Sequence, residues 1–129
     1  MGIAKRRVLI ADDNPLVRKS LLELFANHRY LEVCCEAENG QEAIEAAMKH
    51  RPDLVILDLA MPEMDGLEAS KIIHKLLPEV PIILITLYVD IIQTADTAGF
   101  TRIIPKTKMH ALIGQAEELT GVSARHQTG

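Results

Sequence analysis

Hydrophobic residues fall along the chain in short runs separated by segments of helical periodicity. Five of these runs are four or five residues long and rich in β-branched residues. Such runs are too short for core helices, so each predicts a β-strand. The expected strands cover residues 8–11, 31–35, 54–57, 82–85 and 102–105.

Between the expected strands, apolar residues recur every three or four positions, which predicts amphipathic helices. The first is lined by Val17, Leu21, Leu24 and Phe25. Strand and helix alternate five times without an internal linker or repeat, which predicts an α/β domain with a parallel sheet covered by helices on both faces. The expected helices run through residues 17–25, 39–48, 67–77, 90–98 and 109–119, and the last four are ended by Pro52, Pro78, Gly99 and Gly121.

Composition narrows the class of protein. The chain has 129 residues, 48% of them hydrophobic and 25% charged, which is typical of one globular domain. A net charge of -4 does not favour nucleic-acid binding. The sequence contains neither an apolar run of the ~20 residues that span a membrane nor a signal peptide, so we expect a cytoplasmic protein without membrane contact. We expect the domain to cover residues 1–121, followed by a polar tail or linker at 122–129.

The two cysteines, Cys34 and Cys35, are adjacent in an expected strand. Neighbouring residues of a regular strand point to opposite faces, so an ordinary disulfide between them is not expected. Our interpretation is that they are small hydrophobic residues of a buried strand in a reducing compartment, and a redox pair is the alternative.

Polar side chains stand where the hydrophobic strands end. The first strand leads into Asp12 and Asp13, the third into Asp58, the fourth into Thr86 and the fifth into Lys106. In open parallel sheets, ligands bind outside the carboxyl ends of the strands. Three converging carboxylates repel one another unless a hard cation binds them, and Mg²⁺ suits such a site because it shares carboxylates with waters and a phosphate. A lysine can pair with that phosphate as a point charge.

Each of these residues also has a purely structural interpretation. Asp13 could cap the first helix, and Lys106 could be a solvated surface charge. The coincidence of all five at strand ends favours a common site.

The segments ADDN (11–14) and DLAMPEMDG (58–66), with Thr86 and Lys106 after later strands, resemble the receiver domains of bacterial response regulators. The resemblance covers roughly residues 7–120. It implies a flavodoxin-like three-layer sandwich with five helices and a sheet of strand order 2-1-3-4-5. The segments AENGQEAIE and ITLY particularly resemble receivers that precede a helix-turn-helix DNA-binding module.

The resemblance also implies a role for each site residue. Asp58 would accept a phosphoryl group from a sensor histidine kinase. Thr86 and Lys106 would contact the phosphoryl oxygens, and Mg²⁺ would be held by Asp12, Asp13, Asp58 and the backbone carbonyl of Ala60. Pro62 and Gly66 would shape the loop, and we expect Gly66 to supply a backbone angle that other residues resist. Such a protein is a regulator and not an enzyme, since it catalyses only its own phosphorylation and dephosphorylation.

The chain departs from the family pattern in the segments expected to transmit the signal. Ile103 replaces the usual Tyr or Phe of the fifth strand, the bulky Leu87 follows Thr86, and Pro105 precedes Lys106 instead of following it. We expect phosphorylation to act on the surface built by residues 90–98, the strand at 102–105 and the last helix. We expect that surface to form a weak homodimer and the output to be transcriptional, through a DNA-binding module absent from this chain.

Three alternatives remain open. A flavin-binding protein of this fold would need a glycine- and hydroxyl-rich loop where the chain has ADDNP, and an aspartate phosphatase often has a second Asp at the position of Ala60. A pseudo-receiver or stand-alone receiver, acting as a protein interaction module, is the third alternative, and it draws support from Ile103.

Overall fold

A computed structural model describes residues 4–87 and 99–122 of the chain. Within these ranges, a five-stranded parallel sheet has the order β2-β1-β3-β4-β5. This is the flavodoxin-like order that the family resemblance implied. The strands are β1 (Arg6–Ala11), β2 (Leu31–Ala37), β3 (Leu54–Asp58), β4 (Ile82–Thr86) and β5 (Arg102–Pro105).

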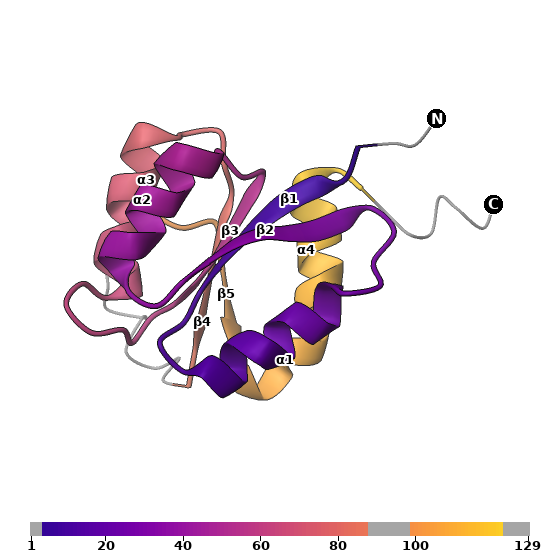
Figure 1. The fold of residues 1–129 in the computed structure, drawn as a ribbon, viewed down its shortest axis with the longest axis horizontal. Helices are drawn as coiled ribbons and strands as arrows, with labels where there is room; N and C mark the ends of the chain where they lie inside the picture. The colour runs from indigo at the N-terminus through magenta and orange to yellow at the C-terminus, as the bar shows by residue number, and fades with distance from the viewer. Residues whose placement is uncertain (1–3, 88–98, 123–129) are drawn as a thin grey trace.

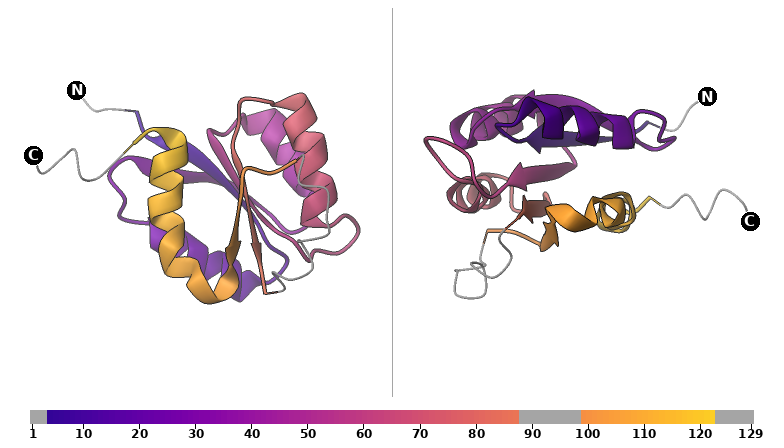
Figure 2. Two further views of the ribbon diagram at one scale, coloured as in Figure 1. Left: turned by 180° about the vertical axis from the view of Figure 1, so that it is seen from behind. Right: turned by 90° about the horizontal axis from the view of Figure 1, so that it is seen from below.

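Helices cover both faces of the sheet, as Figures 1 and 2 show. One face carries α1 (Pro15–Phe25) and α4 (Leu112–Thr120), and the other carries α2 (Gly40–His50) and α3 (Gly66–Leu76). A 3₁₀ helix, η2 (Lys106–Ala111), joins β5 to α4. The helix expected at residues 90–98 lies outside the described residues. Among those described, no helix combines the length and apolarity needed to cross a membrane.

The helices begin and end largely where the sequence predicts. Asn39 caps α2 by accepting from the Glu42 amide at 2.8 Å, and Gly121 ends α4 in the left-handed conformation with a φ of 77°. The last helix differs from the prediction, because its first turn is the 3₁₀ segment, in which Lys108 has non-helical backbone angles. The first helix also differs, since Leu24 is exposed while Leu21 and Phe25 are buried.

The three central strands are almost wholly apolar because helices cover them on both faces. Residues 54–58 of β3 and 82–86 of β4 are all buried. Two hydrophobic clusters lie on opposite sides of the sheet, one packed against α2 and α3 and the other against α1 and α4. The two polar residues that end these strands, Asp58 and Thr86, are therefore held by rigid, packed backbone.

Candidate functional site

The end of β1 places one carboxylate inside the protein and one outside. Asp12 is 0% exposed, and its Oδ1 accepts a hydrogen bond from the Asn14 amide at 2.9 Å. Asp13 is exposed. Asn14 caps α1 with its own side chain, which accepts from the Leu16 amide at 2.9 Å. The interpretation of Asp13 as the helix cap is therefore wrong, and Asp13 is left facing the site.

Asp58 ends β3 in the middle of the sheet, between the end of β1 and the end of β4. Its side chain is nearly buried, with 4% of the residue exposed. Burial, and then the charge of Asp12, raise the pKa of Asp58 from 3.8 to about 6, although Lys106 opposes this shift. Asp58 is therefore a carboxylate at neutral pH, but its charge is less stabilised by the protein than that of an ordinary aspartate.

Lys106 bridges the two buried carboxylates. Its Nζ lies 3.0 Å from Asp12 Oδ2 and 3.2 Å from Asp58 Oδ1, and 16% of its side chain is exposed. Burial disfavours the ammonium, yet the hydrogen bonds and charges of the two carboxylates prevail and raise the pKa of Lys106. Lys106 is thus a fixed charge of the site, and its interpretation as a solvated surface lysine is wrong.

Thr86 and the loop after β3 complete the rim. Thr86 is 1% exposed at the end of β4. The Ala60 amide lies 3.4 Å from Asp58 Oδ1. An open cavity lies at the carboxyl ends of the strands. It is lined by the site residues expected from the sequence except Asp12, together with Asn14 and Leu87, namely Asp13, Asn14, Asp58, Ala60, Thr86, Leu87 and Lys106.

The loop between β3 and α3 is fixed by a close approach and not by the glycine angle we expected. Gly66 donates to the Leu59 carbonyl at 2.8 Å, and a Cβ at Gly66 would lie 2.2 Å from the Asp58 carbonyl oxygen. The left-handed angle belongs instead to Glu63, whose φ is 67°. Glu63 is the centre of a γ-turn closed by a 2.7 Å hydrogen bond from the Met64 amide to the Pro62 carbonyl. The expectation that Gly66 supplies an unusual angle is wrong; the missing Cβ is what matters.

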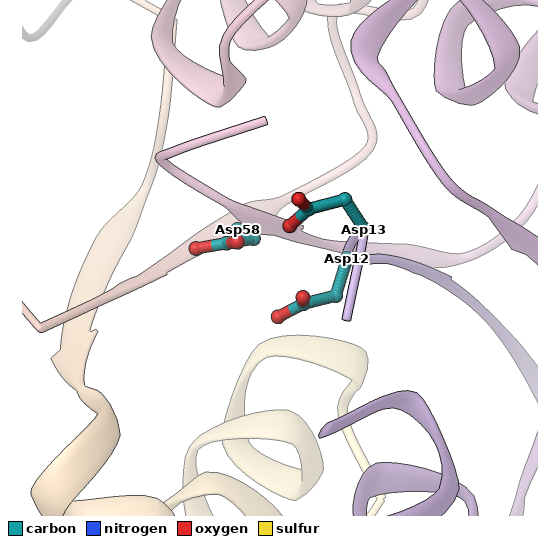
Figure 3. Close-up of side chains that lie close together, drawn as sticks. All are labelled: Asp12, Asp13 and Asp58. Atoms are coloured by element: carbon teal, nitrogen blue, oxygen red, sulfur yellow. The ribbon is translucent and has the colours of Figure 1, made fainter. Parts of the chain in front are cut away.

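The three aspartates form a candidate cation site. Figure 3 shows the side chains of Asp12, Asp13 and Asp58 gathered around one space, and one carboxylate oxygen from each lies within 4.8 Å of the other two. Asp12 Oδ2 is buried, and Lys106 is the cation that pairs with it. Carboxylate oxygens are the ligands of hard divalent cations. The donor set therefore fits Mg²⁺.

One residue that stabilises the site carried no signal in the sequence. Arg18, in α1, donates a hydrogen bond to the backbone carbonyl of Asp12 at 2.7 Å. It also forms ion pairs with Glu36 and Glu38, at the end of the edge strand β2. An arginine on a helix face is normally solvated, yet only 14% of this side chain is exposed. Arg18 fixes the turn that carries Asp12 and Asp13.

Comparison with known proteins assigns the class. The response regulator receiver domain model matches residues 8–116, so the chain belongs to the response regulator receiver family. It is a regulatory domain of two-component systems.

Individual relatives carry this domain in different contexts. The chain is 49% identical over 82 residues to a protein-glutamate methylesterase/protein-glutamine glutaminase of Pyrococcus abyssi, and 44% identical over 97 residues to the transcriptional regulatory protein PdtaR of Mycobacterium tuberculosis. These matches cover 64% and 73% of this chain, but only 22% and 46% of the two relatives. The relatives thus contain further sequence that this chain does not match.

Solved structures agree with the fold. The response regulator TrrA of Thermotoga maritima, in complex with Mg²⁺-BeF, superposes with a TM-score of 0.81 at 31% identity, covering 88% of this chain and 98% of that one. A LuxR-family response regulator of Aurantimonas superposes with a TM-score of 0.80 at 28% identity, covering 92% of this chain and 88% of that one.

Proposed function

We propose that this chain is a phosphoacceptor receiver in which Asp58 takes a phosphoryl group from a sensor histidine kinase. The observation that carries the proposal is the position of Lys106 Nζ, 3.2 Å from Asp58 Oδ1 at the open end of the sheet. A cation bound to a buried carboxylate is the arrangement needed to receive a highly charged group.

The chemistry follows from the side chains. A carboxylate oxygen of Asp58 attacks phosphorus, the phosphorus–nitrogen bond of the phosphohistidine breaks, and the imidazole nitrogen keeps the electron pair. Lys106 follows the incoming charge from the carboxylate to the phosphoryl oxygens, and Thr86 offers a hydroxyl at the same rim. Catalysis is then mainly positioning and electrostatic stabilisation.

Mg²⁺ is the metal that we propose for the acidic cluster. Asp12, Asp13 and Asp58 would hold it through carboxylate oxygens, and Ala60 through its backbone carbonyl. When bound, the ion supplies positive charge that offsets the repulsion between the carboxylate and the transferring phosphoryl group. The Mg²⁺-BeF complex of TrrA supports this proposal, since that receiver shares the fold and 31% of the aligned sequence.

The output is proposed from the relatives. PdtaR is a transcriptional regulator, and the Aurantimonas neighbour belongs to the LuxR family. We therefore propose that this receiver controls transcription through a DNA-binding module. We also propose that it acts in the cytoplasm, as response regulators typically do. The partner surface would include β5 and α4, and a weak homodimer would form through it; the helix expected at residues 90–98 lies outside the described residues.

Ile103 favours a second candidate, an interaction module with weak or no switching. Ile103 is half-buried in β5, opposite Leu84 of β4, and packs against the cluster on the α2 and α3 face. It has no ring to rotate and no hydroxyl to bond, so a receiver built this way could bind partners without the usual conformational response.

Beryllofluoride binding tests the proposed phosphoacceptor site. Fluorine NMR of the protein with Mg²⁺ and beryllofluoride should show a bound signal for wild type and none for Asp58→Asn, whose amide cannot coordinate beryllium as a carboxylate does. Lys106→Ala should weaken the signal, and Lys108→Ala, which removes an exposed lysine two residues away, should not. The same signal in Asp58→Asn as in wild type would refute the proposed site.

A further inference from the structure

The sheet contains one irregularity, and it lies at the two cysteines. Val8 pairs with Val33, but the next residue of β1, Leu9, pairs with Cys35, so Cys34 is an extra residue of β2 with no partner in β1. This is a β-bulge. Its effect is visible in the packing, since Val33 contacts the cluster on the α1 and α4 face whereas Cys35 contacts the cluster on the α2 and α3 face.

The bulge brings together two thiols that a regular strand would separate. In a regular strand, Cys34 and Cys35 would point to opposite faces, and the sequence-based expectation rested on that rule. In the structure, their sulfur atoms lie 3.3 Å apart, both residues are partly buried, and β2 is an edge strand. The premise that the two side chains point to opposite faces is therefore wrong for this pair, although Cys35 does pack against a hydrophobic cluster.

We propose that Cys34 and Cys35 form a vicinal dithiol site that binds a soft, thiophilic centre of the trivalent arsenic class through both sulfurs. Bonds from sulfur to a bound metal are about 2.3 Å long. If the bonds to trivalent arsenic are of similar length and meet near a right angle, the two sulfurs are separated by close to the observed distance. Trivalent arsenic is pyramidal and bonds sulfur at angles of this kind. Soft sulfur ligands also keep this site distinct from the oxygen-lined cluster for a hard cation.

The same geometry disfavours a disulfide. Disulfide-bonded residues usually have Cα atoms about 4.4 to 6.8 Å apart, whereas consecutive residues joined by a trans peptide are held at about 3.8 Å. A bridging atom relieves this constraint because it spans the sulfurs at the distance they already have. Burial, and then the hydrogen bond and charge of Cys34, raise the pKa of Cys35 to about 12, so the pair is also a poor source of the thiolate that peroxides attack.

The binding step balances without an oxidant. Two S–H bonds and the two As–OH bonds of a hydrated arsenical break, two As–S bonds form, and each hydroxide leaves as water with one thiol proton. Arsenic remains trivalent throughout. Protonated thiols are competent in this exchange because the departing hydroxides accept their protons.

Phenylarsine oxide tests the proposal cleanly, because Cys34 and Cys35 are the only cysteines of the chain. Native mass spectrometry of the reduced protein should show one arsenical per chain, and in this adduct neither thiol should react with Ellman's reagent. A 1,2-dithiol should remove the arsenical and an equal concentration of a monothiol should not. Cys34→Ser and Cys35→Ser should each bind about 100-fold or more weakly, because the second bond is no longer intramolecular.

A double variant provides the matched control. Val33→Cys with Cys34→Ser keeps two thiols in β2 but places them on opposite faces of the sheet, so it should bind like the single-thiol variants. Three results would overturn the proposal. They are removal of the arsenical from wild type by a monothiol, binding of two arsenicals per chain by wild type, and binding of the arsenical by the double variant as tightly as by wild type. So would ready formation of an intrachain disulfide, seen as a loss of two hydrogens on treatment with peroxide, in preference to arsenical binding.

Discussion

Gly66 packs directly against the backbone of Asp58, and a Cβ at position 66 would lie 2.2 Å from the Asp58 carbonyl oxygen. The atoms it would meet are backbone, which leaves no flexible side chain to move aside. We expect Gly66→Ala to destabilise the fold by about 1–3 kcal/mol, as overpacked sites do, and to slow phosphorylation by displacing Asp58. Denaturant unfolding and the rate of labelling by acetyl phosphate measure the two effects.

Gly114→Ala is the matched control for this prediction. Gly114 lies in α4, and a Cβ added there would have nothing within 4 Å of it. The same substitution at this position should stabilise the protein by about 0.5–1 kcal/mol through helix propensity. If Gly66→Ala stabilised the protein to a similar degree, the close approach to Asp58 would have no energetic consequence.

The raised pKa of Asp58 predicts a pH dependence of stability in the metal-free protein. The folded state keeps the Asp58 proton up to about pH 6, whereas the unfolded chain releases it near the usual 3.8. Stability from this group is therefore complete below pH 3.8 and is lost as pH rises through 6. Relative to Asp58→Asn, wild type should lose about 1–3 kcal/mol between these limits. Unfolding free energies of both proteins in a chelator, measured from about pH 4 to 7.5, test the trend, and a difference that does not vary with pH would contradict it.

Asp13 is exposed where Asp12 is already paired with Lys106, so we expect Mg²⁺ binding to depend on Asp13 more than on any other side chain except Asp58. Asp13→Ala should weaken Mg²⁺ affinity by about 10-fold or more. Asp13→Lys should also stabilise the metal-free fold by about 0.5–2 kcal/mol, because it removes repulsion at the site. Titration calorimetry and thermal unfolding measure these effects, with Glu23→Gln, an exposed acid on α1, as control. Unchanged affinity in Asp13→Ala would exclude Asp13 as a ligand.

Ile103 predicts a shallow response to phosphorylation. A bound phosphoryl group can shift conformers only through contacts that differ between states, and Ile103 offers no ring or hydroxyl for such a contact. We expect beryllofluoride to cause small amide shifts in β5 and α4 of wild type and larger ones in Ile103→Tyr, with modest tightening of the dimer in sedimentation. Ile103→Val controls for a change of packing alone. If neither wild type nor Ile103→Tyr showed shifts in these elements, the hypothesis of a conformational switch would be rejected in favour of the interaction module.

The sequence was sufficient to predict the strands and the polar residues at their carboxyl ends, because both follow from simple periodicities. Buried parallel strands are continuously apolar, so a polar residue that interrupts the pattern marks a strand end, as Asp58 does. The five residues singled out by this reasoning lie at the ends of four strands, and all of them except Asp12 line the cavity. Asp12 lies beneath it, fully buried against Lys106.

What the sequence could not provide depended on register and on contacts between distant residues. The bulge at Cys34 adds one residue to the β1 pairing, and no local pattern distinguishes it from a regular strand. The role of Gly66 depends on how closely the loop returns to Asp58, and that of Arg18 on three partners that lie 6, 18 and 20 residues away along the chain.

Site-resolved phosphorylation tests the central claim most directly. Incubation with acetyl phosphate and Mg²⁺, followed by intact mass and peptide mapping, should give a single phosphoryl group on Asp58. The label should be absent from Asp58→Asn and from wild type in a chelator. It should be present in the control Asp65→Asn, because Asp65 is the N-cap of α3 and asparagine can cap the helix in the same way. A phosphoryl group mapped to any other residue, or undiminished labelling of Asp58→Asn, would contradict the account.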